Sequence, residues 1–363
     1  MVVREENNTR KSIQLGEIMS DLLNSFIKDS GNKYASLVSG GLDGADVTTF
    51  MDTGCYILNA LVSGDIYKGM PDNKIIALAG EQATGKTYIA MGILSKFLRD
   101  NPEAIVLYFD SEQAVTSEMF KNRGIDPKRV AVFPVSTIEE FRKQVITIVD
   151  KYLELPEEKK KKTMIILDSL GMLSTSKEMT DTAEGKEVRD MTRAQIIKST
   201  FRVLTVKLGL AKIPLIMTNH TYDVIGSYFP TKEMGGGSGL KFAASMIIYL
   251  SKKKDKDSAG EVVGNIIHCK LYKGRFTKEN KVVDVKLNYD SGLDPYFGLL
   301  DLAVQHGIVT KTAGRIELNG TKVFEKQMYE TPEKYFTKEL MSKINIAAAK
   351  EFKYGSESTE ETI

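Results

Sequence analysis

A run of eight residues in the first quarter of the 363-residue chain has the types and spacing that bind phosphate. It fits the pattern G-x-x-x-x-G-K-[ST] at every fixed position. Its residues are Gly80, Glu81, Gln82, Ala83, Thr84, Gly85, Lys86 and Thr87. The two glycines let the backbone curl so that its N–H groups point at phosphate oxygens. In this motif the lysine reaches the β- and γ-phosphates and the threonine hydroxyl coordinates Mg²⁺, so the run predicts a site for ATP and Mg²⁺.

Acidic residues at the ends of two apolar runs are candidates to complete this site. Asp168 ends the run 163–168 and Ser169 follows it, which suits a carboxylate on the magnesium side. Asp110 and Glu112 follow the run 104–109. Because the carboxyl ends of parallel strands converge on one crevice, either of these two carboxylates can face the γ-phosphate and act on a water. Spacing alone leaves both candidates open.

The elements that must position these residues alternate between strands and helices. Apolar runs of strand length lie at 74–79, 104–109, 130–133, 163–168 and 213–218. Helical patterns lie between them at 86–99, 116–122, 137–154 and 189–210. This alternation predicts an α/β fold with a mostly parallel central sheet that is covered by helices on both faces.

Beyond residue 240 the pattern changes to strand, turn and strand. Apolar runs at 245–250, 264–271 and 282–287 predict an antiparallel extension of the sheet, with a polar turn at 252–257. The domains that we expect are an N-terminal oligomerisation helix (1–35), an ATPase core (36–290), a small α-rich C-terminal domain (291–350) and an acidic disordered tail (351–363). The N-terminal helix has an apolar stripe that runs from Ile13 to Ile27, and we expect it to pack against its own core or a neighbouring subunit.

The composition is that of an ordinary globular protein, with 42% hydrophobic and 27% charged residues and a net charge of +2. Cys55 and Cys269 are isolated from each other in sequence, so we expect two reduced thiols without metal-ligand spacing. No apolar run approaches the roughly 18 residues needed to span a membrane. The charged N-terminus does not resemble a secretory signal, so we expect a cytosolic protein without a membrane partner.

These motifs occur together, and in this order, in the RecA-type recombinase family. The chain resembles that family over roughly residues 50–350, and within it the recombinases of tailed bacteriophages. The segments that carry the resemblance are the phosphate loop, Tyr108–Glu112, Ile165–Ser169, Thr218–His220 and Gly235–Ser245. The glycine-rich segment Gly235–Ser245 is typical of strand-exchange proteins among phosphate-loop enzymes. The resemblance implies a RecA-like ATPase core.

The resemblance also assigns roles to single residues. Glu112 falls on the glutamate that positions the attacking water, which favours it over Asp110. His220 falls where many relatives have a glutamine that senses the γ-phosphate. Lys273 and Arg275 fall where relatives insert cations into the ATP site of the neighbouring subunit. Met119 stands where relatives often stack a tyrosine on adenine, so adenine stacking is left open.

Two segments resemble the DNA-binding loops of recombinases. They span about 172–188 and 222–238, and we expect both to be irregular. In the second loop, the glycine N–H groups of Gly235, Gly236 and Gly237 can approach a phosphodiester backbone. The apolar residues Val224, Ile225 and Phe229 can wedge between bases without reading their sequence.

Basic residues follow the first loop on the predicted helix 189–210. Arg189 and Arg193 lie on one side of that helix, whereas Lys198 and Arg202 lie nearly opposite. The resemblance favours Lys198 and Arg202 as phosphate contacts. Arg193 joins them only if the helix begins late or the loop folds over it.

The resemblance implies a DNA-dependent ATPase that polymerises on single-stranded DNA, pairs it with homologous double-stranded DNA and exchanges strands. It implies a helical filament of the chain with itself, a single-strand binding protein and a mediator protein as partners, and the cytoplasm of a phage-infected bacterial host as the location. Two alternatives share the ATPase core. A ring helicase is disfavoured by the segment Gly235–Ser245, and a filament accessory protein without exchange activity is disfavoured by Lys86, Glu112 and Asp168 together.

Overall fold

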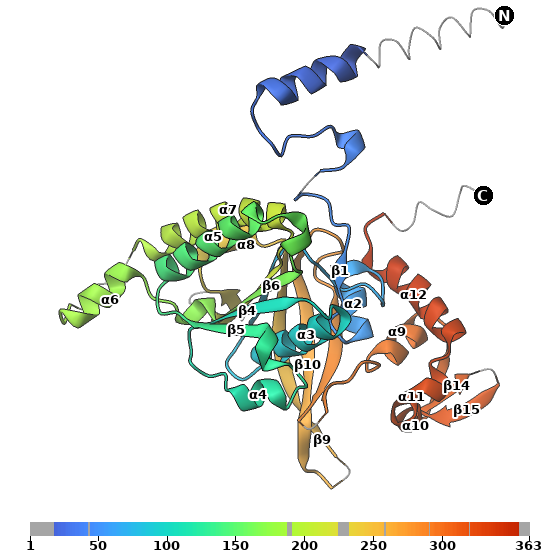
Figure 1. Cartoon of the computed structure of the whole chain (residues 1–363). Coiled ribbons are helices and arrows are strands. Elements are labelled where there is room, and N and C mark those ends of the chain that lie inside the picture. The colour runs from blue at the N-terminus through green and yellow to red at the C-terminus, as the bar shows by residue number, and fades with distance from the viewer. Residues whose placement is uncertain are drawn as a thin grey trace, which may run out of the picture. The chain divides into compact units, whose positions relative to one another are not determined.

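The structure is a computed structural model, and it falls into two compact units, residues 1–48 and 49–363 (Figure 1). The residues that it describes are 18–42, 44–186, 191–223, 232–257, 259–289, 291–318 and 320–355.

The first unit contains the expected N-terminal helix. Residues 18–29 are helical, and a short 3₁₀ helix follows at Val38–Gly40. The side chains of the apolar stripe within this helix are 48–59% exposed; they are Ile18, Met19, Leu22, Leu23 and Phe26. The part of the stripe that includes Ile13 and Leu15 lies outside the described residues. A helix with this much apolar surface in water calls for a covering partner.

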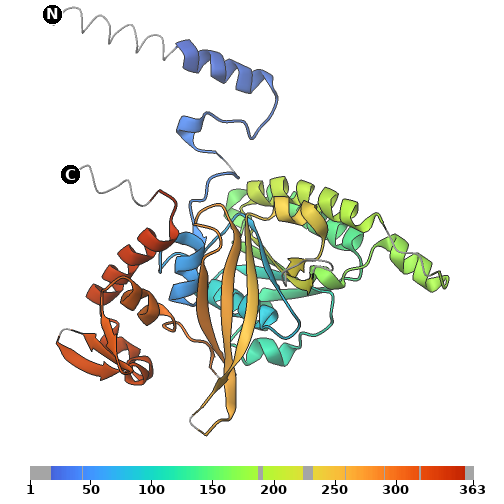
Figure 2. The same cartoon turned by 180° about the vertical axis from the view of Figure 1, so that it is seen from behind.

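A ten-stranded sheet forms the centre of the second unit (Figure 2). Six neighbouring strands are parallel. In spatial order they are β9 (Met246–Lys256), β3 (Ile75–Gly80), β7 (Leu215–Asp223), β6 (Thr163–Asp168), β4 (Ile105–Asp110) and β5 (Val130–Pro134). Antiparallel strands extend the sheet beyond β9; they are β10 (Val262–Gly274), β11 (Val282–Asn288) and β12 (Gly292–Leu293). The predicted parallel sheet with an antiparallel extension is confirmed. A short strand β8 (Lys232–Met234) pairs with the end of β7.

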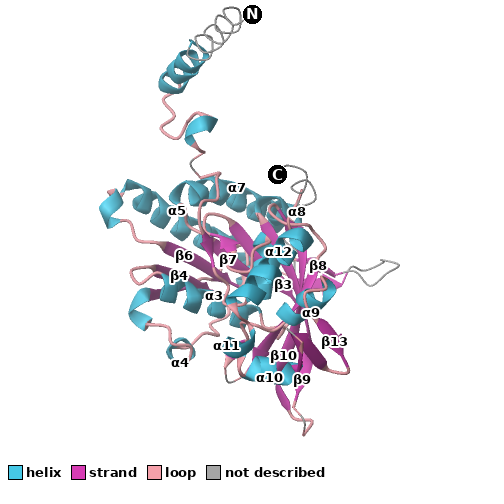
Figure 3. Ribbon diagram, turned by 90° about the vertical axis from the view of Figure 1, so that its right-hand side faces the viewer, coloured by secondary structure: helices cyan, strands magenta, loops and turns pink. Residues whose placement is uncertain are grey.

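Helices cover both faces of this sheet (Figure 3). Alternate residues of each strand point to opposite faces, so Ile76 and Leu78 of β3 enter one hydrophobic core and Ile75 and Ala77 enter the other. The first core contains residues of α2 (Tyr56–Ser63), α3 (Lys86–Asp100) and α4 (Ser117–Lys121). The second contains residues of α5 (Ile138–Glu154), α7 (Arg193–Ala211) and α8 (Gly237–Ala243). Short 3₁₀ helices lie at Pro127–Arg129, Glu157–Lys159 and Leu170–Met172.

The C-terminal region packs into the first core as well. Its helices are α9 (Leu299–Gln305), α10 (Glu325–Glu330), α11 (Pro332–Tyr335) and α12 (Lys338–Phe352). It also contains a three-stranded antiparallel sheet that the α-rich prediction did not include, formed by β13 (Thr310–Thr312), β14 (Arg315–Leu318) and β15 (Thr321–Phe324). Residues 356–363 of the predicted disordered tail lie outside the described residues.

Two expectations about local structure are wrong. The first predicted loop is not irregular throughout, because it contains the helix α6 (Ser176–Ala183). Thr175 and Glu178 form a capping box that satisfies backbone N–H groups at the start of this helix. The predicted turn at 252–257 is mostly strand, since β9 continues to Lys256 and pairs with β10. The turn of this hairpin lies further along, around the hydrogen bond from Asp257 N–H to the Glu261 carbonyl at 2.9 Å.

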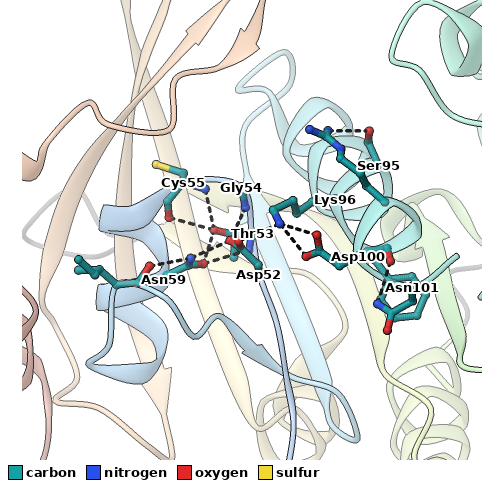
Figure 4. A network of polar contacts seen from close by, with 12 residues as sticks. Asp52, Thr53, Gly54, Cys55, Asn59, Ser95, Lys96, Asp100 and Asn101 are labelled. Carbon is teal, nitrogen blue, oxygen red and sulfur yellow. Dashed lines mark hydrogen bonds and ion pairs between the residues drawn. The ribbon is translucent and has the colours of Figure 1, made fainter. Parts of the chain in front are cut away.

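A polar network, partly buried, contacts the helix that follows the phosphate loop (Figure 4). Its centre is the buried amide of Asn59 in α2, which accepts from the Thr53 hydroxyl at 2.6 Å and donates to Asp52 at 2.8 Å. Asp52 in turn pairs with Lys96 of α3 at 3.2 Å. The network therefore joins α2, the segment before it and α3. The short strands β1 (Phe50–Met51) and β2 (Met70–Pro71) pair beside it.

None of the helices that the structure describes combines the length and apolarity that crossing a membrane requires.

Candidate functional site

The phosphate loop connects β3, which ends at Gly80, to α3, which begins at Lys86. Gly85 has a φ of 94°, which side chains rarely tolerate, and a Cβ there would lie 2.8 Å from the Ile267 side chain. A Cβ on Gly80 would lie 2.6 Å from the carbonyl oxygen of Leu250. Both fixed glycines are thus required by the path of the backbone. The loop leaves the N-terminus of α3 directed at the space where the motif binds phosphate.

Lys86 is held inside this loop. Its side chain is 7% exposed, and its ammonium donates to the carbonyl oxygens of Gly80 at 3.0 Å and Glu81 at 2.7 Å. Burial lowers the pKa of Lys86, and the nearby carboxylates of Glu112 and Asp168 oppose that change. Among the contacts that the structure describes, the Lys86 ammonium has no carboxylate at hydrogen-bond distance. A phosphate oxygen is a stronger acceptor for it than the two neutral carbonyls.

Asp168, at the end of β6, receives hydrogen bonds from three hydroxyl groups. Thr87 and Tyr108 each donate to its Oδ2 at 2.7 Å, and Thr218 donates to its Oδ1. Burial raises the pKa of Tyr108, and the Asp168 carboxylate adds to that rise, so the phenol stays protonated and acts as a donor. Sequence reasoning found Asp168 and Thr87 but missed Tyr108 and Thr218. Their signal is a hydroxyl near the end of each of the apolar runs 104–109 and 213–218, which flank β6 as parts of β4 and β7.

Asp110 and Glu112 have different surroundings. Asp110 is buried, and its two carboxylate oxygens accept from the backbone N–H groups of Glu112 at 3.0 Å and Val115 at 3.4 Å. Glu112 accepts from the Ser169 hydroxyl at 2.7 Å and lies 3.5 Å from Nε2 of His220. The carboxylate oxygens of Asp110 are therefore used by hydrogen bonds to the backbone of the turn that follows it. Glu112 lies with Ser169, which follows β6, and with His220 of β7.

The residues present fit a magnesium ion that is bound together with a nucleotide. Within the described ranges there is no group of three or more His, Cys, Asp or Glu side chains able to hold a metal ion by themselves. Magnesium in phosphate-transfer sites takes one or two protein ligands, and phosphate oxygens and waters complete its shell. The Thr87 hydroxyl and the Asp168 carboxylate supply that small set.

Met119 lines a cleft of about 1660 Å³ beside α3. Tyr88, which directly follows Thr87, lines the same cleft, as does Tyr289. The guanidinium of Arg123 lies 4.6 Å from the centre of the Tyr88 ring and donates to the Met119 carbonyl at 2.9 Å. The cleft that contains Met119, the position predicted to lie near adenine, thus also contains an aromatic residue, Tyr88, that sequence reasoning did not select.

Lys273 caps the C-terminus of α8. Its ammonium donates to the carbonyl oxygens of Lys241 at 2.6 Å, Phe242 at 3.2 Å and Ala244 at 2.8 Å. Burial lowers the pKa of Lys273, and the charge of Arg275 lowers it further. Arg275 itself is exposed. In the single chain, the two residues predicted to enter a neighbour's ATP site are therefore a helix cap and an exposed cation.

Arg193 is the first residue of α7, so this helix begins later than the predicted residue 189. The Arg193 guanidinium donates to the Gly171 carbonyl at 3.2 Å and pairs with Glu178 of α6 at 3.5 Å. It lines a small pocket of about 280 Å³ with Gly235 and Gly236. Arg193 therefore lies beside both predicted DNA segments.

Two further basic residues of α7, Lys198 and Arg202, are exposed. Arg189 and the apolar residues Val224, Ile225 and Phe229 lie outside the described residues.

The glycine-rich segment is bonded to the strand that contains His220. The Gly235 N–H donates to the His220 carbonyl at 3.0 Å, and the Asn219 side chain donates to the Gly235 carbonyl at 2.8 Å. Gly236 and Gly237 follow with φ values of 96° and 68°. At the other edge, Lys232 of β8 pairs with Glu81 of the phosphate loop, a contact that sequence reasoning missed. Residues near the phosphates and residues of the second loop are thus in direct contact.

Comparisons with known proteins agree with these features. The model of the RecA N-terminal domain family matches residues 18–294. The recombination and repair protein of Enterobacteria phage T4 (UvsX) is 33% identical over 295 residues, which cover 81% of this chain and 73% of that protein. Protein RecA of Mycoplasma mycoides subsp. mycoides is 27% identical over 318 residues, 85% of each chain. Protein RecA of Malacoplasma penetrans is 24% identical over 256 residues, 70% of this chain and 74% of that protein. The resemblance stated from the motifs is confirmed.

The geometry of the loop predicts the effect of removing its cation. Lys86→Ala should weaken ATP binding about 10- to 100-fold, because a charge-assisted hydrogen bond to phosphate is lost. Equilibrium titration with a fluorescent ATP analogue measures this change. The exposed Lys338 on α12 provides a matched control, Lys338→Ala, which should bind as the unaltered chain does. Equal affinity of the two variants would contradict the assignment of the loop.

Proposed function

The chain belongs to the RecA family of recombination and repair proteins, and from this premise we propose that it is a DNA-dependent ATPase and homologous recombinase. In this proposal it forms helical filaments on single-stranded DNA, pairs that strand with a homologous duplex and exchanges strands. The observation that carries the proposal is a pair of hydrogen bonds between β7 and the glycine-rich segment. They join the nucleotide side of the sheet to that segment. A change at His220 reaches Gly235 through one hydrogen bond.

The ATPase part of the proposal uses the residues at the ends of the parallel strands. Lys86 and the loop N–H groups bind the phosphates, and Thr87 with Asp168 holds Mg²⁺, which when bound neutralises charge on the transferring phosphoryl group. Glu112 orients the attacking water. Ser169 fixes the Glu112 carboxylate by its hydrogen bond, and His220 is close enough to respond to what Glu112 binds. The cleft beside Met119 and Tyr88 receives the base.

The DNA part uses backbone contacts that carry no sequence information. Lys198 and Arg202 are exposed cations on α7, and Arg193 joins the first loop to the glycine-rich segment. The N–H groups of Gly235, Gly236 and Gly237 can approach a phosphodiester closely because no side chain intervenes. The protein then binds any sequence, and Watson–Crick pairing between the two DNA molecules supplies the specificity.

Filament formation in this proposal covers the exposed apolar face of the N-terminal helix with a second copy of the chain. A heterologous, head-to-tail contact of this kind generates an open helical assembly. The same contact brings Lys273 and Arg275 to the ATP site of the neighbour, where cations stabilise the transition state. An ammonium has three donors, and Lys273 uses all three on α8 in the single chain. It must therefore leave the helix end in order to act on a neighbour.

By similarity to the phage T4 protein, the proposed setting is the cytoplasm of a phage-infected bacterium. A single-strand binding protein and a mediator that loads the filament are the further partners in this proposal.

Strand exchange tests the proposal directly. Purified protein with ATP and Mg²⁺ should exchange strands between circular single-stranded DNA and a homologous linear duplex, and electron microscopy should show open filaments on the single strand. Closed hexameric rings with unwinding but no exchange would support a helicase instead. Filaments without ATP turnover or exchange would support an accessory protein.

Glu112→Gln should bind ATP with near-normal affinity yet hydrolyse it about 100-fold more slowly or worse, because an amide is a poor acceptor for the proton of the water. Filaments on single-stranded DNA should then persist. Steady-state phosphate release measures turnover, with the exposed Glu317→Gln as control. Fast turnover in Glu112→Gln would return the role to Asp110.

Lys273→Ala should lose DNA-stimulated turnover by about a hundredfold, because the cation acts across the subunit interface. Basal turnover of dilute protein should stay the same. Phosphate release with and without single-stranded DNA measures both rates, and DNA affinity is measured in parallel, with Lys322→Ala as control. Loss of basal turnover to the same extent would argue against a role in the neighbouring site.

A further inference from the structure

The carboxylate of Asp168 is held from both sides by the strands that flank it. In the sheet, β6 lies between β7 and β4. Tyr108 of β4 donates its hydroxyl to Oδ2 at 2.7 Å, and Thr218 of β7 donates its hydroxyl to Oδ1. Neither of these residues belongs to the phosphate loop. Each hydrogen bond joins a different neighbouring strand to the same carboxylate.

The surroundings of the two hydroxyl groups fix their direction. Tyr108 and Thr218 are both fully buried, so neither hydroxyl can turn to solvent. In the sheet register, Tyr108 of β4 lies opposite Ile166 of β6, two residues before Asp168. The side chains of Tyr108, Ile166 and Asp168 therefore point to one face of the sheet. The ring of Phe120 packs edge-on against the Tyr108 ring, with centres 5.7 Å apart. The ring position, and with it the phenol oxygen, is therefore set by packing.

We propose that Tyr108 and Thr218 are positioning residues for magnesium, which hold the Asp168 carboxylate in the orientation that the metal site requires. The inference rests on the proposed role of Thr87 and Asp168 in binding Mg²⁺ with nucleotide. Outer hydrogen bonds of this kind orient the groups that hold a metal and change its affinity by about 10- to 100-fold.

The number of acceptor positions on the carboxylate supports this role. Two carboxylate oxygens offer about four lone pairs. Thr87 and Tyr108 use two on Oδ2, and Thr218 uses one on Oδ1. With three positions taken by protein hydroxyls, one position on Oδ1 remains, so Asp168 can hold a cation through one oxygen and not through both. The three hydroxyls thus decide which side of the carboxylate is left for the metal, next to Thr87, the other predicted ligand, on the first turn of α3.

A purely structural role makes a different prediction. If the two hydroxyls only satisfy a buried carboxylate, removing one lowers the stability of the fold and leaves the dependence on metal unchanged. If they position the metal site, removing one raises the Mg²⁺ concentration that nucleotide binding requires and leaves nucleotide binding without metal unchanged. Tyr108→Phe and Thr218→Val each delete one hydroxyl with little change of shape. The chain offers matched controls in Thr218→Ser, which keeps the hydroxyl, and Tyr152→Phe, which removes a tyrosine hydroxyl bonded at 3.0 Å to the Lys161 carbonyl.

The experiment titrates Mg²⁺ into the full-length protein with a fluorescent ADP analogue and records the concentration at half-maximal binding. Tyr108→Phe and Thr218→Val should each raise that concentration about tenfold, while affinity in EDTA stays unchanged. Both controls should follow the unaltered chain. Urea unfolding without nucleotide reports the stability of each variant separately. If one variant does not fold, the other provides the same measurement.

Three results would overturn the inference. The first is a Mg²⁺ titration of both hydroxyl-deleted variants that superimposes on that of the unaltered chain. The second is an equal loss of affinity with EDTA and with Mg²⁺, because the hydroxyls would then act on the phosphate loop and not on the metal. The third is nucleotide binding by the unaltered chain that is independent of Mg²⁺. A tenfold shift combined with failed strand exchange would instead sustain this inference and refute the proposed recombinase activity.

Discussion

The buried carboxylate at the end of β6 is the constraint on which the site depends. Asp168 is 6% exposed, and a buried ionised carboxylate is tolerated only when hydrogen bonds replace water. The bonds come from α3 through Thr87, from β4 through Tyr108 and from β7 through Thr218. Each donor belongs to a different element, so the carboxylate fixes the helix of the phosphate loop against two strands. The parallel order of β7, β6 and β4 makes this possible, because it brings three carboxyl ends to one edge.

From this edge, one strand leads to the predicted DNA segment. On β7, Thr218 bonds to Asp168, Asn219 bonds to the Gly235 carbonyl, and His220 lies beside Glu112 while its carbonyl accepts from Gly235. Three consecutive residues thus contact the proposed magnesium side, the glycine-rich segment and the glutamate that we propose to position water. The pair formed by Glu81 and Lys232 adds a second connection. It is exposed and worth little in energy by itself, so the route through β7 is the stronger of the two.

The parts of this architecture that sequence predicts are local in the chain. The phosphate loop, the strand that ends at Asp168 and the alternation of strands and helices each follow from neighbouring residues. The helix α6 also has a local signal, the capping box of Thr175 and Glu178, but the polar composition of the segment favoured the prediction of an irregular loop. The contacts of Tyr108, Thr218 and Lys273 join residues 29 to 60 positions apart. They depend on strand order and register, which periodicity does not specify, so the contacts of Tyr108 and Thr218 with Asp168 and the cap of α8 emerge only from the fold.

Lys273 connects the proposed site in a neighbour to the proposed DNA segment. Its three bonds to α8 are made to neutral carbonyls, whereas a phosphate offers charge-assisted bonds that are about twice as strong. Burial already lowers the pKa of this lysine, so its charge is less well solvated in the single chain than in water. Transfer to a neighbouring nucleotide relieves that cost but removes the cap from the helix that directly follows Gly235 and Gly236. In the proposed filament, a neighbouring nucleotide that attracts Lys273 therefore loosens α8, and DNA that moves α8 releases Lys273. The linkage is reciprocal, because both events draw on the same three hydrogen bonds.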